Sequence, residues 1–211
     1  MDKIPLILFA GEGKGQAPID ELLEYAKVEY RALMEFDGKT IIYRILENFH
    51  KSGIISEYFI LGIPENLVKL PPDIDVSKVH IFETEGMEFA DKLNFVAKHI
   101  LEKIKTTPSI FPENSTHVMF STSDIPFLKA STISELYDRT RDLTFDLQAS
   151  IVPKELMEDR FGETERTYLL LRNDKEKKEY CLGDITILNL LKVEKGVEKL
   201  RALRKNRKKV L

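Results

Sequence analysis

The sequence predicts a three-layer α/β protein with a mixed, mostly parallel sheet and helices on both faces. Apolar strand candidates alternate with amphipathic helix candidates as far as Tyr137, which is typical of parallel strands joined by helical crossovers. The first strand candidate begins at Ile4 and is apolar without interruption, as expected of a strand that is buried on both faces. Residues 1–190 are therefore expected to form one domain, followed by a basic helix over 191–211.

Most of the hydrophobic periodicity that predicts helices and strands lies in the first two thirds of the chain. After the first strand come three glycines, and residues 19–26 read as a short helix or a structured loop. A turn at 37–39 precedes Thr40, which is suited to cap a helix whose apolar face starts at Ile41. Further strands are expected at 58–62, 79–82 and 117–121, and further helices over 89–104 and from 131 or 132 to 137.

The pattern changes from Gln148 onward. Residues 149–152, 167–171 and 180–188 read as strands, with a polar hairpin between the last two. This more antiparallel part is expected to extend the sheet. Beyond it, residues 192–211 hold nine Lys and Arg against two Glu, which favours a solvated terminal helix over a nucleic-acid contact.

Composition narrows the functional classes. The net charge of −3 over 211 residues does not favour general nucleic-acid binding. No apolar stretch is long enough for a membrane span, and the N-terminus lacks the pattern of a signal peptide. Cys181 is the only cysteine, so we expect no internal disulfide and a cytoplasmic protein.

A glycine-rich loop follows the first strand, with glycines at 11, 13 and 15 and Lys14 among them. Such a loop lets the backbone approach a phosphate closely. An ordinary turn from strand to loop explains the glycines equally well. The loop is a candidate phosphate site that needs support from elsewhere in the chain.

Two carboxylates interrupt the strand pattern. Asp124 follows the strand at 117–121, and Asp184 lies after a glycine within the last strand. Because ligands bind at the carboxyl ends of the strands in such sheets, both side chains suit a shared Mg²⁺ ion. Turn, cap or bulge roles are the structural alternatives for both aspartates.

Cations suited to a phosphate are Lys14, Arg31 and Arg166, although each of them also suits an ordinary surface position. The four histidines show no ligand-like spacing, and Cys181 has no histidine near it in the sequence. A zinc site and a cysteine nucleophile are therefore not expected.

These segments together resemble nucleotidyltransferases of the glycosyltransferase-A-like fold, which is Rossmann-like. The resemblance is greatest to the NTP transferases similar to molybdenum-cofactor guanylyltransferase. It covers about residues 1–190 in order and rests on LFAGEG at 8–13, RALMEFDGKT at 31–40, SDIPFL at 123–128, RTY at 166–168 and GD at 183–184.

The resemblance implies a Mg²⁺-dependent transfer of an NMP group from an NTP, with CTP or GTP favoured, to a phosphorylated small-molecule acceptor. Asp124 and Asp184 would hold the Mg²⁺, and Arg31 would contact phosphate and assist catalysis. The nucleotide would be bound by five consecutive residues, Ala10, Gly11, Glu12, Gly13 and Lys14, and by Arg166.

Three departures from the family pattern keep a second interpretation open. The glycine loop lacks the usual Arg-Met pair, Arg31 replaces a Lys, and Asp184 stands where Asn is common. A protein that binds a nucleotide or a nucleotide sugar without turnover fits them too. A glycosyltransferase of the same fold would usually carry an Asp-x-Asp motif, which STSDIP at 121–126 does not supply.

Overall fold

The computed structural model describes residues 3–11, 17–106, 116–140, 142–163, 167–172, 176–193 and 196. Among these residues, seven strands form one mixed sheet in the order β5-β4-β1-β6-β9-β7, with β8 paired to β9. Their bounds are β1 Ile4–Phe9, β4 Ile55–Leu61, β5 Val79–Phe82, β6 His117–Thr122, β7 Leu147–Pro153, β8 Leu169–Arg172 and β9 Lys177–Asn189.

Four neighbouring strands, from β5 at one edge to β6, are parallel, because β1 pairs in parallel with β4 and β6, and β4 with β5. β9 is antiparallel to β6, β7 and β8. The parallel part and the antiparallel extension from residue 148 onward are both as predicted.

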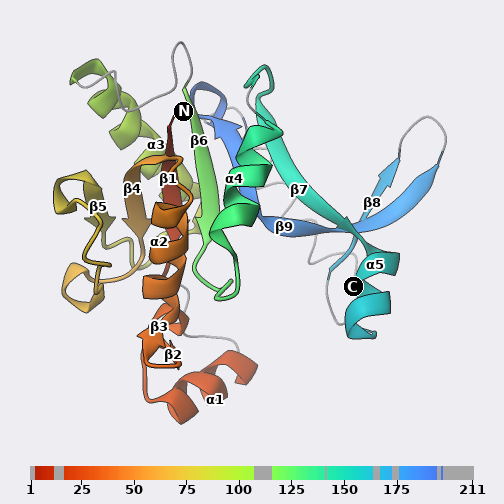
Figure 1. The fold of residues 1–211 in the computed structure, drawn as a ribbon, viewed down its shortest axis with the longest axis horizontal. Helices are drawn as coiled ribbons and strands as arrows, with labels where there is room; N and C mark the ends of the chain where they lie inside the picture. Colours follow the sequence, from red (N-terminus) through yellow and green to blue (C-terminus); the bar gives the residue numbers. More distant parts are fainter. Residues whose placement is uncertain are drawn as a thin grey trace.

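Helices cover both faces of the sheet, which gives the predicted three layers. In Figure 1, α2 and α4 lie in front of the strands and α3 lies behind them. The hairpin formed by β2 and β3 lies at the lower edge, where the parallel strands end, and α1 lies beside it. The bounds are α1 Ala17–Ala26, β2 Glu35–Phe36, β3 Lys39–Thr40, α2 Ile41–Lys51, α3 Phe89–Thr106, α4 Ala130–Asp138 and α5 Lys154–Phe161.

Each face of the sheet has its own apolar cluster, because successive side chains of a strand point to opposite faces. On β1, Leu6 and Leu8 pack with the buried stripe of α2, whereas Ile7 packs with the buried stripe of α3. The α2 stripe consists of Ile41, Ile42, Ile45, Leu46 and Phe49, which are at most 3% exposed. The uninterrupted apolar run of β1 is thus explained by burial on both sides.

The predicted start and end of helix α2 are confirmed. The Thr40 hydroxyl accepts a hydrogen bond from the Tyr43 N–H at 3.3 Å, so Thr40 caps α2 as predicted. Gly53 ends that helix with a φ of 73°, a left-handed conformation that favours glycine.

Several predicted bounds need correction, and β4 begins at Ile55 rather than at 58. Helix α4 begins at Ala130 rather than at 131 or 132, and β8 begins at Leu169 rather than at 167. Helix α5 was not predicted, because none of its residues is buried and it shows no apolar periodicity. Of the basic helix expected over 191–211, residues 194–195 and 197–211 lie outside the described part, so that prediction stays untested.

At the β5 edge of the sheet, a buried carboxylate accounts for the position of one of the four histidines. Glu57 on β4 is 6% exposed and accepts hydrogen bonds from His80 on β5 at 2.9 Å and from Lys103 on α3 at 2.6 Å. The His80 ring stacks on Phe59 with a centroid distance of 4.9 Å. Burial lowers the pKa of His80, and the Lys103 charge adds to this against the opposing effect of Glu57.

This cluster predicts a stability that depends on pH. Because the pKa of folded His80 lies below that of the unfolded chain, about 6.5, unfolding takes up a proton as the pH falls through that value. We expect the urea midpoint to be lower at about pH 5.5 than at about pH 7.5, and His80→Gln to reduce this difference. An unchanged difference in the variant would mean that other groups cause it.

Candidate functional site

The carboxyl ends of β1, β4, β5 and β6 are held together by backbone hydrogen bonds beyond the paired strands. The Ala10 N–H donates to the Leu61 carbonyl at 2.8 Å, and the Ser123 N–H donates to the Phe9 carbonyl at 2.8 Å. The Gly62 N–H donates to the Phe82 carbonyl at 2.9 Å. The loops that leave these strands therefore start from fixed positions, as a binding site at this edge requires.

Close packing of the backbone explains why residue 11 is a glycine, without reference to a ligand. An added Cβ on Gly11 would lie 1.9 Å from the Gly62 carbonyl oxygen, and one on Gly62 would lie 2.7 Å from the Gly11 Cα. Gly62 also has a φ of 90°. Two chain segments thus pass each other at a distance that only glycine permits.

Asp124 lies two residues beyond the end of β6. Its Oδ1 accepts a hydrogen bond from the Thr122 hydroxyl at 2.5 Å, which fixes the orientation of the carboxylate. Phe9 pairs with Thr122 at the end of the two parallel strands, and Gly11 follows Phe9 by two residues, as Asp124 follows Thr122. The candidate glycine loop and the candidate carboxylate therefore both start at this edge of the sheet.

Arg31 reaches this carboxylate from 93 residues away in the sequence. It opens the 3₁₀ turn Arg31–Leu33, and its Nη1 lies 3.5 Å from the Asp124 Oδ2. The two side chains are 26% and 43% exposed. An exposed ion pair of this length adds little to stability, in the range of about 0–1 kcal/mol, so folding alone is a weak reason to bring the two groups together.

The position of Arg31 follows from apolar packing of its neighbour. Ala32 is 1% exposed and belongs to the core cluster on the α2 face of the sheet. The Met34 carbonyl accepts a hydrogen bond from the Ile41 N–H at 2.9 Å, which ties the turn to the start of α2. The guanidinium is therefore carried by a well-anchored segment.

Asp184 lies on the strand beside β6. The antiparallel pairing of β6 with β9 reaches Ser121 and Ile185, and Asp184 directly precedes Ile185 on β9, where the pairing with β7 has a register shift. Asp184 is exposed, and it interacts with other groups of the protein. Asp124 and Asp184 are thus brought to the same edge, on neighbouring strands.

The remaining predicted site residues divide into two groups. Ala10 is described: it is 2% exposed and belongs to the apolar core, and its N–H is bonded to the Leu61 carbonyl. Glu12, Gly13, Lys14 and Arg166 lie outside the described residues.

The side of this edge near β5 is acidic. Burial raises the pKa of the Tyr30 hydroxyl, and the negative charges of Glu85, Glu29 and Glu83 raise it further. Tyr30 directly precedes Arg31. A bound phosphate would be repelled from these glutamates and attracted to the side of Arg31.

Two exposed aromatic rings lie beside the site, and no sequence pattern indicates a role for them. Phe127, in the DIPF segment, is 79% exposed, and Phe36 at the tip of the β2–β3 hairpin is 40% exposed. Their ring centroids are 6.1 Å apart in an edge-to-face arrangement. The pair links the hairpin to the loop that carries Asp124.

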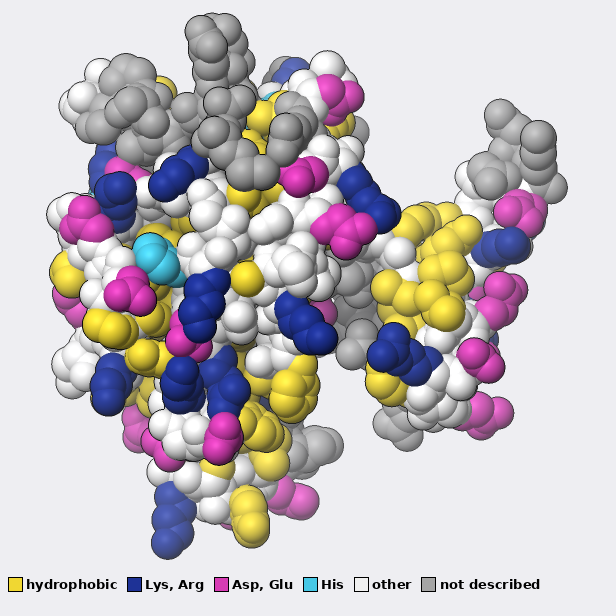
Figure 2. Space-filling model, in the orientation of Figure 1, with side chains coloured by type: hydrophobic (Ala, Val, Ile, Leu, Met, Phe, Trp, Pro, Cys, Tyr) yellow, Lys and Arg dark blue, Asp and Glu magenta, His cyan; other side chains and the backbone are white. Residues whose placement is uncertain are grey.

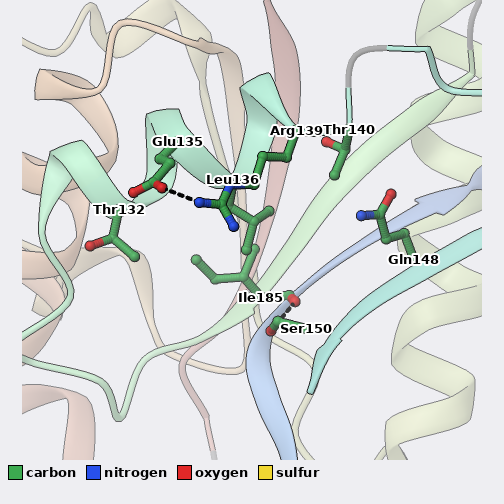
Figure 3. A pocket seen from close by; sticks show the side chains of 8 residues that line it. All are labelled: Thr132, Glu135, Leu136, Arg139, Thr140, Gln148, Ser150 and Ile185. Carbon is green, nitrogen blue, oxygen red and sulfur yellow. Dashed lines mark hydrogen bonds and ion pairs between the residues drawn. The ribbon is translucent and has the colours of Figure 1, made fainter. Parts of the chain in front are cut away.

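A pocket of about 290 Å³ lies between α4, β7 and β9 (Figure 3). Leu136 and Ile185 supply its apolar surface, and Ile185 directly follows Asp184 on β9. Figure 3 shows the ion pair between Glu135 and Arg139 along α4, with an Nη2–Oε1 distance of 2.5 Å. The polar lining is completed by Thr132, Thr140, Gln148 and Ser150.

These pocket residues were not predicted, because the polar members come from α4, the turn that follows it and β7, and none stands out in the sequence. The Ser150 hydroxyl donates to the Ile185 carbonyl at 3.0 Å, which holds β7 to β9 at this point.

The oxygen ligands at the carboxyl edge fit a hard cation. Mg²⁺ is usually held by one or two carboxylates together with substrate phosphates and water, and Asp124 and Asp184 supply that number. Among the described residues there is no group of three or more His, Cys, Asp or Glu side chains that would form a complete metal site from protein alone. The arrangement thus fits a metal shared with a phosphorylated substrate.

The search for membrane-spanning segments adds one negative finding. No helix in the described part of the chain is both long enough and apolar enough to cross a bilayer.

Comparison with known proteins identifies the fold. No family model matches the sequence. A hypothetical transferase from Thermus thermophilus is 21% identical, with a TM-score of 0.66 over 98% of this chain and 74% of that one.

Two structures of named enzymes are also similar. CMP:2-keto-3-deoxy-manno-octonic acid synthetase, solved in complex with CTP, is 10% identical, with a TM-score of 0.58 over 98% of this chain and 85% of that one. The 2-C-methyl-D-erythritol 4-phosphate cytidylyltransferase of Francisella tularensis is 12% identical, with a TM-score of 0.54 over 98% and 82%. At these identities the similarity shows the fold alone, so the chain has the α/β fold that is found in these nucleotidyltransferases.

Proposed function

We propose that the protein is a nucleotidyltransferase that moves an NMP group from an NTP to a phosphorylated small-molecule acceptor. The observation that carries the proposal is the convergence of Arg31, Asp124 and Asp184 at the carboxyl edge of the sheet, beside Gly11. The similarity of fold to two enzymes that are named as a cytidylyltransferase and a CMP-sugar-acid synthetase supports this class of reaction.

The reaction fits the groups that are present. A phosphate oxygen of the acceptor attacks the α-phosphorus of the NTP, a new phosphorus–oxygen bond forms, and the bond from the α-phosphorus to the bridging oxygen breaks as pyrophosphate leaves. The attacking oxygen is already ionised, so no general base is required. Catalysis then depends on positioning and on charge stabilisation.

Each of the described site residues has a role in the proposed reaction. The guanidinium of Arg31 attracts the phosphate oxygens and offsets their charge in the transition state. Thr122 holds one oxygen of Asp124, so the lone pairs that remain on the carboxylate face a fixed direction. Asp124 and Asp184 would hold Mg²⁺, which supplies charge neutralisation when it is bound.

The resemblance in sequence implies the finer features of the substrate. CTP or GTP is favoured as the donor, and the glycine loop with Lys14 and Arg166 would contribute to nucleotide binding. Because the chain matches no family model, membership of the NTP transferases similar to molybdenum-cofactor guanylyltransferase is part of the proposal.

The test is pyrophosphate release. The protein is mixed with Mg²⁺, each of the four NTPs and a panel of phosphorylated sugars, polyols and sugar acids, and pyrophosphate is measured with a coupled assay. We expect release that needs both one NTP and one acceptor, and that stops when EDTA removes the metal.

A thermal-shift titration separates this function from simple binding. A catalyst is expected to be stabilised by its NTP more strongly with Mg²⁺ than without it. Stabilisation by a nucleotide that is independent of metal, with no pyrophosphate from any acceptor, would support the binding protein without turnover instead.

A further inference from the structure

Both oxygens of the Asp124 carboxylate interact with other side chains of the protein. Oδ1 accepts a hydrogen bond from the Thr122 hydroxyl at 2.5 Å, and Oδ2 lies 3.5 Å from the Arg31 Nη1. Each carboxylate oxygen has two lone pairs, so the group can still accept a further ligand. A metal ion bound to this carboxylate would, however, lie close to the positive charge of Arg31.

The pair of Arg31 and Asp124 differs from the ion pairs that stabilise local structure. Figure 2 shows several Lys and Arg side chains over α2 and the β2–β3 hairpin, with acidic side chains among them. Lys39 and Lys51 in this region both pair with Glu47, which is eight and four residues away. Arg31 and Asp124 are 93 residues apart, so the fold rather than sequence proximity brings their charges together.

The backbone segments that carry the two charges are held in place independently of the ion pair. Ala32 is 1% exposed in the core, and the Phe36 ring lies 6.1 Å from that of Phe127, three residues after Asp124. The Arg31 side chain itself is 26% exposed. Exposed side chains change rotamer rapidly, so the guanidinium can leave the carboxylate without any movement of the backbone.

We propose that the ion pair of Arg31 and Asp124 couples nucleotide binding to metal binding. Without a nucleotide, the Arg31 charge lowers the affinity of Asp124 for a divalent cation. The phosphates of a bound nucleotide pair with the guanidinium instead, which removes its charge from the carboxylate. The inference rests on the proposed function, because it takes Mg²⁺ and an NTP as the ligands of this edge.

The charges involved favour this exchange of partners. Two unit charges 4 Å apart change a binding constant about fivefold in bulk water, and a divalent cation doubles the interaction energy. Salt screens part of this repulsion, so we expect Arg31 to weaken metal binding to the free protein by about tenfold. A polyphosphate carries several negative charges and suits the planar guanidinium, so it is a stronger partner for Arg31 than one exposed carboxylate.

The coupling must act in both directions. If a nucleotide strengthens the binding of a cation at Asp124, the cation strengthens the binding of the nucleotide by the same factor. The physical reason is that a cation on the carboxylate replaces Arg31 there and leaves the guanidinium to the phosphates.

The first test is Mn²⁺ binding to the full chain without nucleotide, with free Mn²⁺ measured by electron paramagnetic resonance. We expect Arg31→Gln to bind Mn²⁺ about tenfold more tightly than the wild type, whereas Arg31→Lys keeps the charge and should stay within about threefold of it. Adding Asp124→Asn to Arg31→Gln should abolish the gain. A merely structural role of Arg31 predicts no gain in affinity when the side chain is lost.

Arg139→Gln is the matched control. It removes the same charge from another exposed ion pair, that with Glu135 on α4, and should leave the Mn²⁺ affinity unchanged. An exposed pair adds little to stability, so Arg31→Gln should have the urea midpoint of the wild type.

The second test uses inorganic tripolyphosphate, which carries the phosphates that all NTPs share. Titrated calorimetrically in EDTA, it should bind the wild type and Arg139→Gln equally, and Arg31→Gln about tenfold more weakly.

Three results would overturn the coupling. They are an Mn²⁺ affinity that is equal, lower or undetectable in Arg31→Gln, a gain that persists with Asp124→Asn, and tripolyphosphate that binds the wild type and Arg31→Gln alike or not at all. Neither test needs turnover. If both succeed and no acceptor yields pyrophosphate, the coupling stands and nucleotidyl transfer fails; pyrophosphate release with an unchanged Mn²⁺ affinity gives the reverse.

Discussion

Asp124→Asn is expected to lower pyrophosphate release by about a thousandfold, which corresponds to about 4 kcal/mol of transition-state stabilisation. The substitution keeps the size of the side chain and its hydrogen bond with Thr122, but it removes the charge beside Arg31. A neutral amide offers Mg²⁺ a weaker ligand than a carboxylate does. The measurement is the coupled pyrophosphate assay at saturating NTP and acceptor.

Asp146→Asn is the matched control. Asp146 is 67% exposed and lies 4.0 Å from Lys192, at the start of β7 and away from the carboxyl edge of the parallel strands. Its activity should equal that of the wild type. If Asp124→Asn retains full activity while its urea midpoint is unchanged, Asp124 has no part in binding the metal.

Gly11→Ala is expected to destabilise the fold by about 3 kcal/mol or more, because overpacking a close contact forces the backbone to move. The added methyl group would lie 1.9 Å from the Gly62 carbonyl oxygen, and the atoms that must shift are backbone atoms rather than a flexible side chain. Urea unfolding followed by circular dichroism measures the change in the free energy of unfolding.

The control for this variant is Gly53→Ala, at the end of α2. Gly53 has a φ of 73°, but no atom lies within 4 Å of an added Cβ, so the cost is only that of a left-handed conformation, about 1–2 kcal/mol. Equal losses of stability in the two variants would show that the close approach of Gly11 to Gly62 adds no cost.

The sequence predicts the central part of the fold well because its signals there are local and strong. The continuous apolar run of β1 and the amphipathic period of α2, with Thr40 as its cap, each specify an element without reference to the rest of the chain. Alternation of such elements then limits the topology to parallel strands with crossovers.

The antiparallel end of the sheet, with β8 and helix α5, could not be predicted in the same way. Helix α5 buries none of its residues, so it leaves no periodic trace in the sequence. The leucines of β8 read as an ordinary strand, and only the structure shows that they are exposed instead of packed in the core. Burial depends on contacts between distant segments, which periodicity does not reveal.

The candidate site could be predicted from the sequence only in part. Arg31 and Asp124 were selected separately, from sequence patterns and from a family resemblance, and their pairing depends on a contact across 93 residues. The Thr122 hydroxyl that holds Asp124 was missed, although its position two residues before the aspartate at a strand end was a usable signal. For Gly11, the structure adds a packing reason beside the phosphate-binding one.

The pairing of β9 has a thermodynamic consequence. Gly183, which directly precedes Asp184, admits the Ser150 hydroxyl where a Cβ would come within 2.2 Å. Because β9 pairs with β6, β7 and β8, the strand that carries Asp184 is already ordered, so less conformational entropy is lost when a metal and nucleotide bind there. Bound metal and nucleotide would in turn stabilise the protein against unfolding, because they bind the folded chain and not the unfolded one.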